Sequence, residues 1–367
     1  MEALKDVLTL LHTLFLCKAT STVSIFGLKI QNYLLRILIL IPMYISCATL
    51  FAFCIFKVDN IFKLLSVGYS LVGTLSMQCI YLSLIANESF LNQSIDHLKS
   101  IVRQRHRRGG TTASIYEKRE AIIAKAFKRC WMYSCFLLAS IFADPFLKPL
   151  LNALFGWSPP DTWYLPFPGI FPFDTKTLIG HYVALSIQFL SIAVYMIIFS
   201  TILSLYIAFC RYIEALLEEF GFIMAKLINL TAIHTRSATE EKEIMIEAIE
   251  LHLEMLTMMQ NVKYIMSMPL FLELLTFIIN SSFFLLQLDT LLGKFNSDVG
   301  LTINGIVVHC SFSYVLCYYA SDVTLCGLQI AQIIYNDLPW YRLHLENQQR
   351  IIRTSFSYYM VLKRAGS

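Results

Sequence analysis

The residue types that carry chemistry in enzymes and metal sites are present in this sequence, but their spacing is not that of a site. None of the eight histidines lies in a His-x-x-Glu-His motif or another metal-ligand spacing. No Gly-x-x-x-x-Gly-Lys-Ser/Thr phosphate loop occurs, and no serine lies in a Gly-x-Ser-x-Gly elbow. The ten cysteines are scattered, mostly in apolar stretches, which is typical of small buried residues. The sequence therefore predicts no enzyme, no metal and no cofactor.

Few polar side chains interrupt the long apolar stretches. A charge at the centre of a bilayer costs at least about 2.5–3.5 kcal/mol, so we expect Glu273 and Arg36 to extend to the membrane interface. Gln78, Gln188 and His309 either bond to a neighbouring helix or line a cavity. Such a scarcity of charges argues against a proton-coupled or ion-coupled transporter, which needs charged groups near the midplane.

The elements that must hold these residues are membrane-spanning helices. The sequence is 57% hydrophobic and only 15% charged, whereas soluble domains contain about 45–50% apolar and about 25% charged residues. The mean hydropathy is +0.61. The fold class is therefore all-α, a polytopic bundle forming one domain over residues 1–367. Six stretches are long enough to cross about 30 Å of hydrocarbon as helices: 33–56, 61–86, 130–151, 178–209, 269–288 and 301–319.

Lysine and arginine residues set the orientation. They are dense between the second and third predicted spans, whereas the stretches that follow the third and fifth spans carry only Lys176 and Lys294. By the positive-inside rule, the N-terminus and the loops after spans two, four and six are cytoplasmic. We expect the basic run 103–108 to meet the anionic inner leaflet rather than nucleic acid. Residues 211–268 have the pattern of amphipathic helices that extend the neighbouring spans into the cytoplasm.

The predicted external stretch 157–174 is rich in proline and aromatic residues. Repeated prolines prevent a helix, and aromatic side chains suit a membrane–water interface. Two interpretations remain open, namely a packed lid over the outer end of the bundle and a plain interfacial loop.

A ligand that arrives from outside would enter the outer halves of the spans. The residues there are mainly apolar and aromatic with a few hydroxyls, which suits a small volatile molecule held by shape. For any one of these residues taken alone, ordinary helix packing is the favoured explanation. The candidate ligand-binding residues are Tyr69, Val72, Gly73, Ser140, Phe142, Phe146, His181, Tyr182, Leu185, Ser186 and Phe189.

Two blocks late in the sequence resemble the signature of insect odorant receptors. The first contains Tyr319, Thr324, Ile330-Ala331, Tyr335-Asn336 and Trp340-Tyr341, and the second contains Thr354-Ser355-Phe356-Ser357-Tyr358 and Leu362. The stretches Leu165-Pro166-Phe167-Pro168 and Phe171-Pro172-Phe173-Asp174, with Tyr182 and Gln188, are similar to the second external loop and fourth span of that family. Two positions depart from the pattern, because Ala320 replaces the usual glycine and Gly327 the usual serine.

The resemblance implies an odorant-binding subunit of a ligand-gated, non-selective cation channel. In that family the subunit forms a hetero-tetramer with a shared co-receptor in the plasma membrane of olfactory sensory neurons, and cytoplasmic extensions of the later helices join the subunits. The final helix lines the pore. The resemblance places four residues in that helix: Thr354, Ser355, Ser357 and Tyr358.

One departure concerns that final helix. Between Trp340 and Arg353 the sequence is short and polar, where the family carries roughly one more span of about 20 residues. The last segment, about 345–363, is therefore predicted to be shortened. The alternatives are a non-conducting truncated or spliced receptor, a G-protein-coupled receptor and a gustatory-type receptor. The cytoplasmic N-terminus opposes the second, and the absence of the gustatory Thr-Tyr ending opposes the third.

Overall fold

The computed structural model describes residues 22–25, 28–58, 61–155, 165–232, 238–291 and 297–337, together with 343 and 349. The chain divides into two compact units, which are described separately. The first comprises Met1–Asp96, Glu120–Ile207 and Ile265–Cys317, and the second comprises His97–Arg119, Ala208–Tyr264 and Tyr318–Ser367. The predicted last segment, about 345–363, lies outside the described residues apart from position 349.

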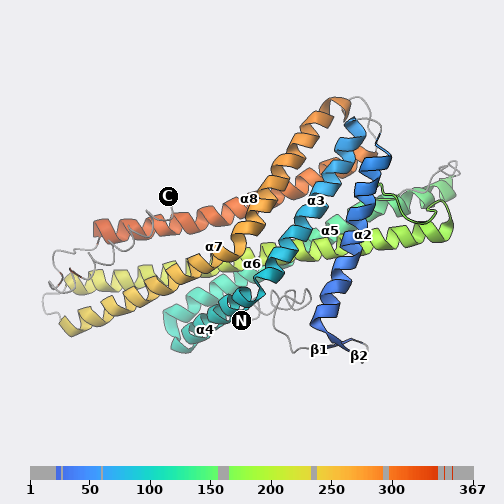
Figure 1. The fold of residues 1–367 in the computed structure, drawn as a ribbon. Coiled ribbons are helices and arrows are strands. Elements are labelled where there is room, and N and C mark those ends of the chain that lie inside the picture. The colour runs from blue at the N-terminus through green and yellow to red at the C-terminus, as the bar shows by residue number, and fades with distance from the viewer. Residues whose placement is uncertain are drawn as a thin grey trace. The chain divides into compact units, whose positions relative to one another are not determined.

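Long helices make up nearly all of the described chain (Figure 1), so the predicted all-α fold class is confirmed. A small antiparallel hairpin, β1 (Thr22–Ile25) paired with β2 (Leu28–Gln31), precedes them. This hairpin was not predicted, although both of its four-residue strands alternate apolar and polar residues, as a β-strand does. The helices are α2 (Asn32–Phe56), α3 (Ile61–Ala86), α4 (Glu88–Arg108), α5 (Gly110–Phe155), α6 (Leu178–Ala232), α7 (Ala238–Leu291) and α8 (Ser297–Gln332), which continues as a π-helical turn, η1 (Ile333–Asp337).

Each of the six predicted spans lies within a helix, and α3 has the predicted bounds. Several helices are longer than the predicted spans: α6 has 55 residues and α7 has 54, or about 80 Å each at 1.5 Å per residue. Among the described residues, four helices contain an apolar stretch long enough to cross a membrane. These stretches are Ile39–Phe56, Val67–Ala86, Ile179–Leu230 and Thr239–Phe283.

In the first unit, polar side chains join neighbouring helices. Helices α2 and α3 pack side by side, and Gln78 Nε2 on α3 donates to the carbonyl oxygen of Met43 on α2 at 2.8 Å. Arg36 pairs with Glu88 at 2.7 Å. The expectation that Glu273 extends to the interface is wrong, because this side chain is only 1% exposed. Glu273 lies on the same face of α7 as Thr276 and Asn280, three and seven residues further on, and all three side chains are buried.

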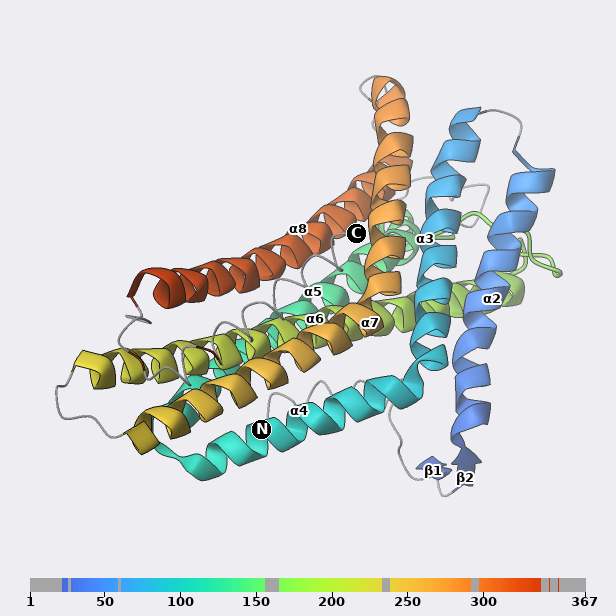
Figure 2. The same ribbon diagram turned by 60° about the vertical axis from the view of Figure 1, so that its left-hand side comes forward.

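Helix α4 (Figure 2) begins in the first unit and ends in the second, and the residues at both of its ends favour a helix. Its acidic first residue and its basic last turn both complement the helix dipole. Gly109 and Gly110 follow with φ of 68° and 63°, a left-handed conformation that glycine adopts without strain and that ends the helix. The buried face of α4 consists of residues spaced three or four apart: Leu91, Ile95, Leu98, Val102 and Arg105.

Candidate functional site

An apolar cluster forms in the first unit where α5 meets α6. Phe142 of α5 and Leu185 and Ile192 of α6 are its buried centre. The ring of Phe142 also contacts the ring of Phe189 edge-to-face, with centroids 5.0 Å apart, a favourable geometry for an aromatic pair. Partly buried residues complete the cluster: Leu138, Ile141, Leu165, Phe167 and Met196.

The external stretch folds back onto this cluster, because Leu165 and Phe167 belong to it. The side-chain amide of Gln188 on α6 holds the loop in place. Its Oε1 accepts from the backbone N–H of Phe167 at 3.3 Å, and its Nε2 donates to the carbonyl oxygen of Phe167 at 2.8 Å. Both polar groups of this buried side chain are thereby satisfied by a single residue of the loop.

The same loop is joined to α2 three residues further on. The backbone N–H of Ile170 donates to the carbonyl oxygen of Thr49 at 3.1 Å. A Cβ atom at Gly169 would lie 3.2 Å from Thr49 Cβ and Oγ1 and 3.3 Å from the ring of Phe171, which is closer than ordinary contact. Glycine therefore leaves room for the loop to approach α2 closely, and a larger residue would push its neighbours aside. The described part of the loop is thus packed, as the lid interpretation requires.

The loop passes into α6 through a helix cap. Thr177 precedes the first helical residue, and its Oγ1 accepts from the backbone N–H of Gly180 at 3.1 Å. Threonine is a preferred residue at this position because its oxygen satisfies an otherwise unpaired donor. Asp174 adds a bond from the backbone N–H of Lys176 at 2.9 Å. These caps fix the point where the loop ends and hence the position of Gln188, three turns into the helix.

The structure divides the predicted ligand residues of α6 between two faces. His181 and Leu185 are buried, on the face that also carries Gln188, whereas Tyr182 is 51% and Phe189 42% exposed, and Ser186 is exposed with them. Helical periodicity explains the division, because 181, 185 and 188 recur at spacings of three and four, and so do 182, 186 and 189.

The remaining predicted ligand residues lie on α3 and α5. Tyr69, Val72 and Gly73 are half-buried on α3, and nothing lies within 4 Å of a Cβ atom built at Gly73. Ser140 is half-buried and donates to the carbonyl oxygen of Leu137 at 2.8 Å. The side chain of Phe146 lies outside the described residues. Of the predicted set, the structure brings Phe142, Leu185 and Phe189 together.

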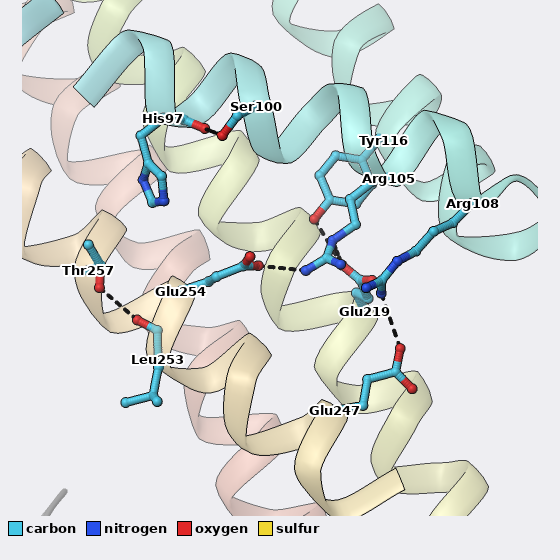
Figure 3. Close-up of polar contacts among 10 residues, drawn as sticks. All are labelled: His97, Ser100, Arg105, Arg108, Tyr116, Glu219, Glu247, Leu253, Glu254 and Thr257. Carbon is cyan, nitrogen blue, oxygen red and sulfur yellow. Dashed lines mark hydrogen bonds and ion pairs between the residues drawn. The ribbon is translucent and has the colours of Figure 1, made fainter. Parts of the chain in front are cut away.

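A second polar arrangement lies in the second unit and centres on Arg105 (Figure 3). Arg105 Nε lies 3.1 Å from Glu219 Oε2, and its Nη2 lies 2.5 Å from Glu254 Oε2. Tyr116 donates its hydroxyl to Glu219 Oε2 at 3.0 Å. Arg108 lies at the end of the same helix and pairs with Glu247 at 3.1 Å. These contacts join α4, α5, α6 and α7.

The pKa values of Arg105 and Tyr116 are both shifted in the direction that keeps these groups protonated beside the two glutamates. Burial alone would lower the pKa of Arg105, but the carboxylates of Glu219 and Glu254 outweigh it and raise the pKa above its usual value. Burial, and then the negative charge of Glu219, raise the pKa of Tyr116 well above its usual value. The guanidinium therefore stays charged, and the phenol keeps the proton that it donates.

A further chain of charges joins α5, α6 and α8 in the same unit. Glu214 Oε2 accepts from Nη1 of Arg119 and from Nη1 of Arg211, both at 2.6 Å. Arg211 Nη2 lies 3.0 Å from Asp322 Oδ2, and its Cζ lies 4.5 Å from the centre of the Tyr319 ring. A cation over an aromatic face is attracted by the ring quadrupole. Tyr319, which was singled out as a motif residue, thus contacts a buried charge.

The expectation for the basic run is corrected at Arg105, which faces protein and not lipid. Arg105 is 3% exposed between two glutamates, and Arg108 pairs with Glu247. A sequence signal was available for Arg105, since it continues the apolar spacing of Leu98 and Val102. Sequence reasoning missed Arg119, Glu214, Arg211 and Asp322 as partners, because a pattern along one helix does not reveal what faces it.

The other motif residues are described only in part. Thr324 is exposed on α8, where its hydroxyl donates to the carbonyl oxygen of Ala320 at 2.9 Å. Tyr335 lies in η1, with its side chain outside the described residues. Trp340 and the predicted pore residues Thr354, Ser355, Ser357 and Tyr358 also lie outside the described residues. In the part of the chain that is described, no group of His, Cys, Asp and Glu could hold a metal ion.

The sequence matches a known family over most of its length. The family is described as 7tm Odorant receptor, and its model matches residues 90–361. The chain belongs to this odorant receptor family. No curated protein matches the sequence. The family is one of receptors and not of enzymes.

Solved structures resemble this odorant receptor in fold. The insect olfactory receptor OR5 from Machilis hrabei matches with a TM-score of 0.66 at 14% identity, covering 96% of this chain and 88% of that one. The same receptor in complex with eugenol matches with a TM-score of 0.63 at 14% identity, covering 94% and 88%. At this identity the likeness shows the fold, a polytopic helical bundle, and with the family match it identifies an odorant receptor of the membrane.

Proposed function

We propose that this odorant receptor is the odorant-binding subunit of a ligand-gated, non-selective cation channel. The match of residues 90–361 to the odorant receptor family is the observation that carries this proposal. The subunit would act with a shared co-receptor in a hetero-tetramer, in the plasma membrane of olfactory sensory neurons. By the charge pattern of the sequence, the N-terminus is cytoplasmic, and the helices cross the membrane at the six predicted spans and a shortened last segment.

The ligand is a small, mainly apolar volatile molecule. The cluster around Phe142, Leu185 and Phe189 supports this choice, because it offers aromatic and aliphatic surface at the place where the predicted ligand residues of α5 and α6 meet. Machilis hrabei OR5, which shares this fold, has been solved with eugenol, a small aromatic molecule of this kind. The candidate residues on α3, Tyr69, Val72 and Gly73, complete the proposed site.

Opening of the channel requires the odorant to bind the open state better than the closed state. α6 contains the residues of the proposed site in its first turns, and it also contains Arg211, which contacts α8 through Asp322 and Tyr319.

Co-expression with an insect odorant co-receptor, followed by recording of odour-evoked currents, tests the proposal. A panel of small volatile alcohols, esters and phenols should include at least one molecule that evokes a non-selective cation current dependent on this chain. Epitope tags at the two ends test the topology, and an extracellular N-terminal tag would overturn the channel assignment. A chain that reaches the surface and binds odorant without carrying current would support the alternative of a non-conducting receptor.

A further inference from the structure

The geometry points to Gln188 as the residue that latches the external loop over the apolar cluster, and hence as a positioning residue that sets how long an odorant stays bound. The first part of this inference, the latch, follows from contacts within the first unit. The second part, the residence time, rests on the proposed function.

The latch depends on one buried side chain. Gln188 is 3% exposed, and its amide bonds to both the N–H and the carbonyl oxygen of Phe167, at 3.3 and 2.8 Å. An amide that pairs with both groups of a residue copies the pairing of two β-strand residues and fixes position and orientation together. Leu165 and Phe167 then lie against Phe142, Leu185 and Ile192. Loss of the amide would leave the N–H and carbonyl of Phe167 without their partner.

The second attachment of the loop is of a different kind. It joins the backbone of Ile170 to the backbone of Thr49, so no side-chain substitution removes this bond directly. Opening on the side of the apolar cluster is therefore controlled by Gln188, with the attachment to α2 as the point about which the loop moves. This arrangement separates access to the cluster from the anchoring of the loop.

The test measures opening of the loop independently of any current. Leu165→Cys places a thiol in the part of the loop that packs on the cluster, and a membrane-impermeant thiol reagent applied to intact cells reports how often it is exposed. The reaction of the same chain without Leu165→Cys gives the background from native cysteines, several of which are exposed. Gln188→Met keeps the length of the side chain but can neither donate to the carbonyl nor accept from the N–H.

A matched control is available in the same unit. Gln78 is also a buried glutamine, and its amide joins two helices and not the loop, through the carbonyl oxygen of Met43. We expect Gln188→Met to speed labelling of Leu165→Cys by about threefold to tenfold, the equivalent of one or two lost hydrogen bonds, and Gln78→Met to leave it unchanged. Equal labelling in Gln188→Met and the parent, or equal acceleration by Gln78→Met, would overturn the latch.

Current recordings test the second part. Where the parent responds to odorant, Gln188→Met should speed the decay of the current after washout by a similar factor, with a smaller effect on the maximal current. Unchanged decay with faster labelling would overturn the link to residence time but keep the latch. If the parent gives no current, the proposed function fails while the labelling result still stands. If Gln188→Met does not reach the surface, Gln188→Glu, whose carboxylate keeps an acceptor for the N–H of Phe167 but cannot donate to its carbonyl oxygen, should speed labelling instead, and unchanged labelling there overturns the latch as well.

Discussion

Arg211 on α6 and Asp322 on α8 form an ion pair of 3.0 Å that links two helices distant in the sequence. The guanidinium also bonds to Glu214 and lies 4.5 Å from the centre of the Tyr319 ring, so three groups share one buried cation. Because Arg211 keeps two of these partners when the third is lost, the pair contributes to stability without determining the fold.

Asp322→Asn removes the charge of that pair and keeps its shape. We expect it to lower the free energy of unfolding by about 1 kcal/mol, a modest amount because Asp322 is 27% exposed and the interaction is partly screened. Thermal unfolding of the purified receptor in detergent measures the effect. Ser321→Ala, an exposed neighbour on the same helix, is the control, and identical melting temperatures for the two variants would contradict the prediction.

Arg105→Met should be far more harmful. It removes the cation between Glu219 and Glu254 and leaves a nearly fully buried carboxylate of Glu219 without its charge partner, which costs about 3–5 kcal/mol. Loss of surface expression and of a monodisperse peak in detergent should follow. Arg103→Met on the exposed face of the same helix is the matched control and should change stability by less than about 0.5 kcal/mol. Comparable losses in both variants would show that charge number matters and not the buried contact.

Tyr116→Phe isolates one hydrogen bond of the same network. Loss of the hydroxyl that donates to Glu219 at 3.0 Å should cost about 1–3 kcal/mol. The effects of Tyr116→Phe and Arg105→Met should not add in the double variant, because both substitutions remove partners of one carboxylate. Strict additivity in the double-mutant cycle would contradict a shared network.

The raised pKa of Tyr116 also predicts a pH dependence. The folded protein holds the phenolic proton of Tyr116 more tightly than the unfolded chain does. The stability that this proton contributes is therefore fully present below the pKa of the unfolded chain, about 10. It is lost as the pH rises above that value. Melting temperatures measured from pH 8 to 11 should fall at the alkaline end, and Tyr116→Phe should reduce that fall. A profile that is identical in the variant would contradict the shift.

Two glycine substitutions distinguish the loop from the predicted ligand face. Gly169→Ala brings a methyl group within 3.2 Å of Thr49, and such overpacking should lower the free energy of unfolding by about 1–3 kcal/mol.

Gly73 lies in the middle of α3 with open space around the position of a Cβ atom, so Gly73→Ala should raise the free energy of unfolding by about 0.5–1 kcal/mol. If Gly73 lines the odorant site, the methyl group added by Gly73→Ala should also shift the odorant concentration that gives a half-maximal response. An unchanged dose response in Gly73→Ala would remove this residue from the site.

Helices and the family could be predicted from the sequence, because hydropathy and motifs lie within one continuous segment of the chain. Each of the six apolar runs of span length lies within a helix, and the motif residues around Tyr319 predicted the family that the chain belongs to. The amphipathic pattern of residues 211–268 predicted that α6 and α7 extend beyond their apolar parts, but the extension of α5 back to Gly110 was not predicted. An amphipathic helix continues as long as another surface covers its apolar face, and that surface comes from elsewhere in the chain.

The sequence by itself determined a helical membrane receptor of the odorant receptor family, since hydropathy and motif spacing are properties of consecutive residues. Only the tertiary structure decided which polar residues meet. It placed Arg105 between Glu219 and Glu254, joined Arg211 to Asp322, buried Glu273 and set Gln188 against Phe167. The physical reason is that a buried charge or amide is stable only with a partner, and that partner comes from another helix or loop at a position that no local pattern specifies.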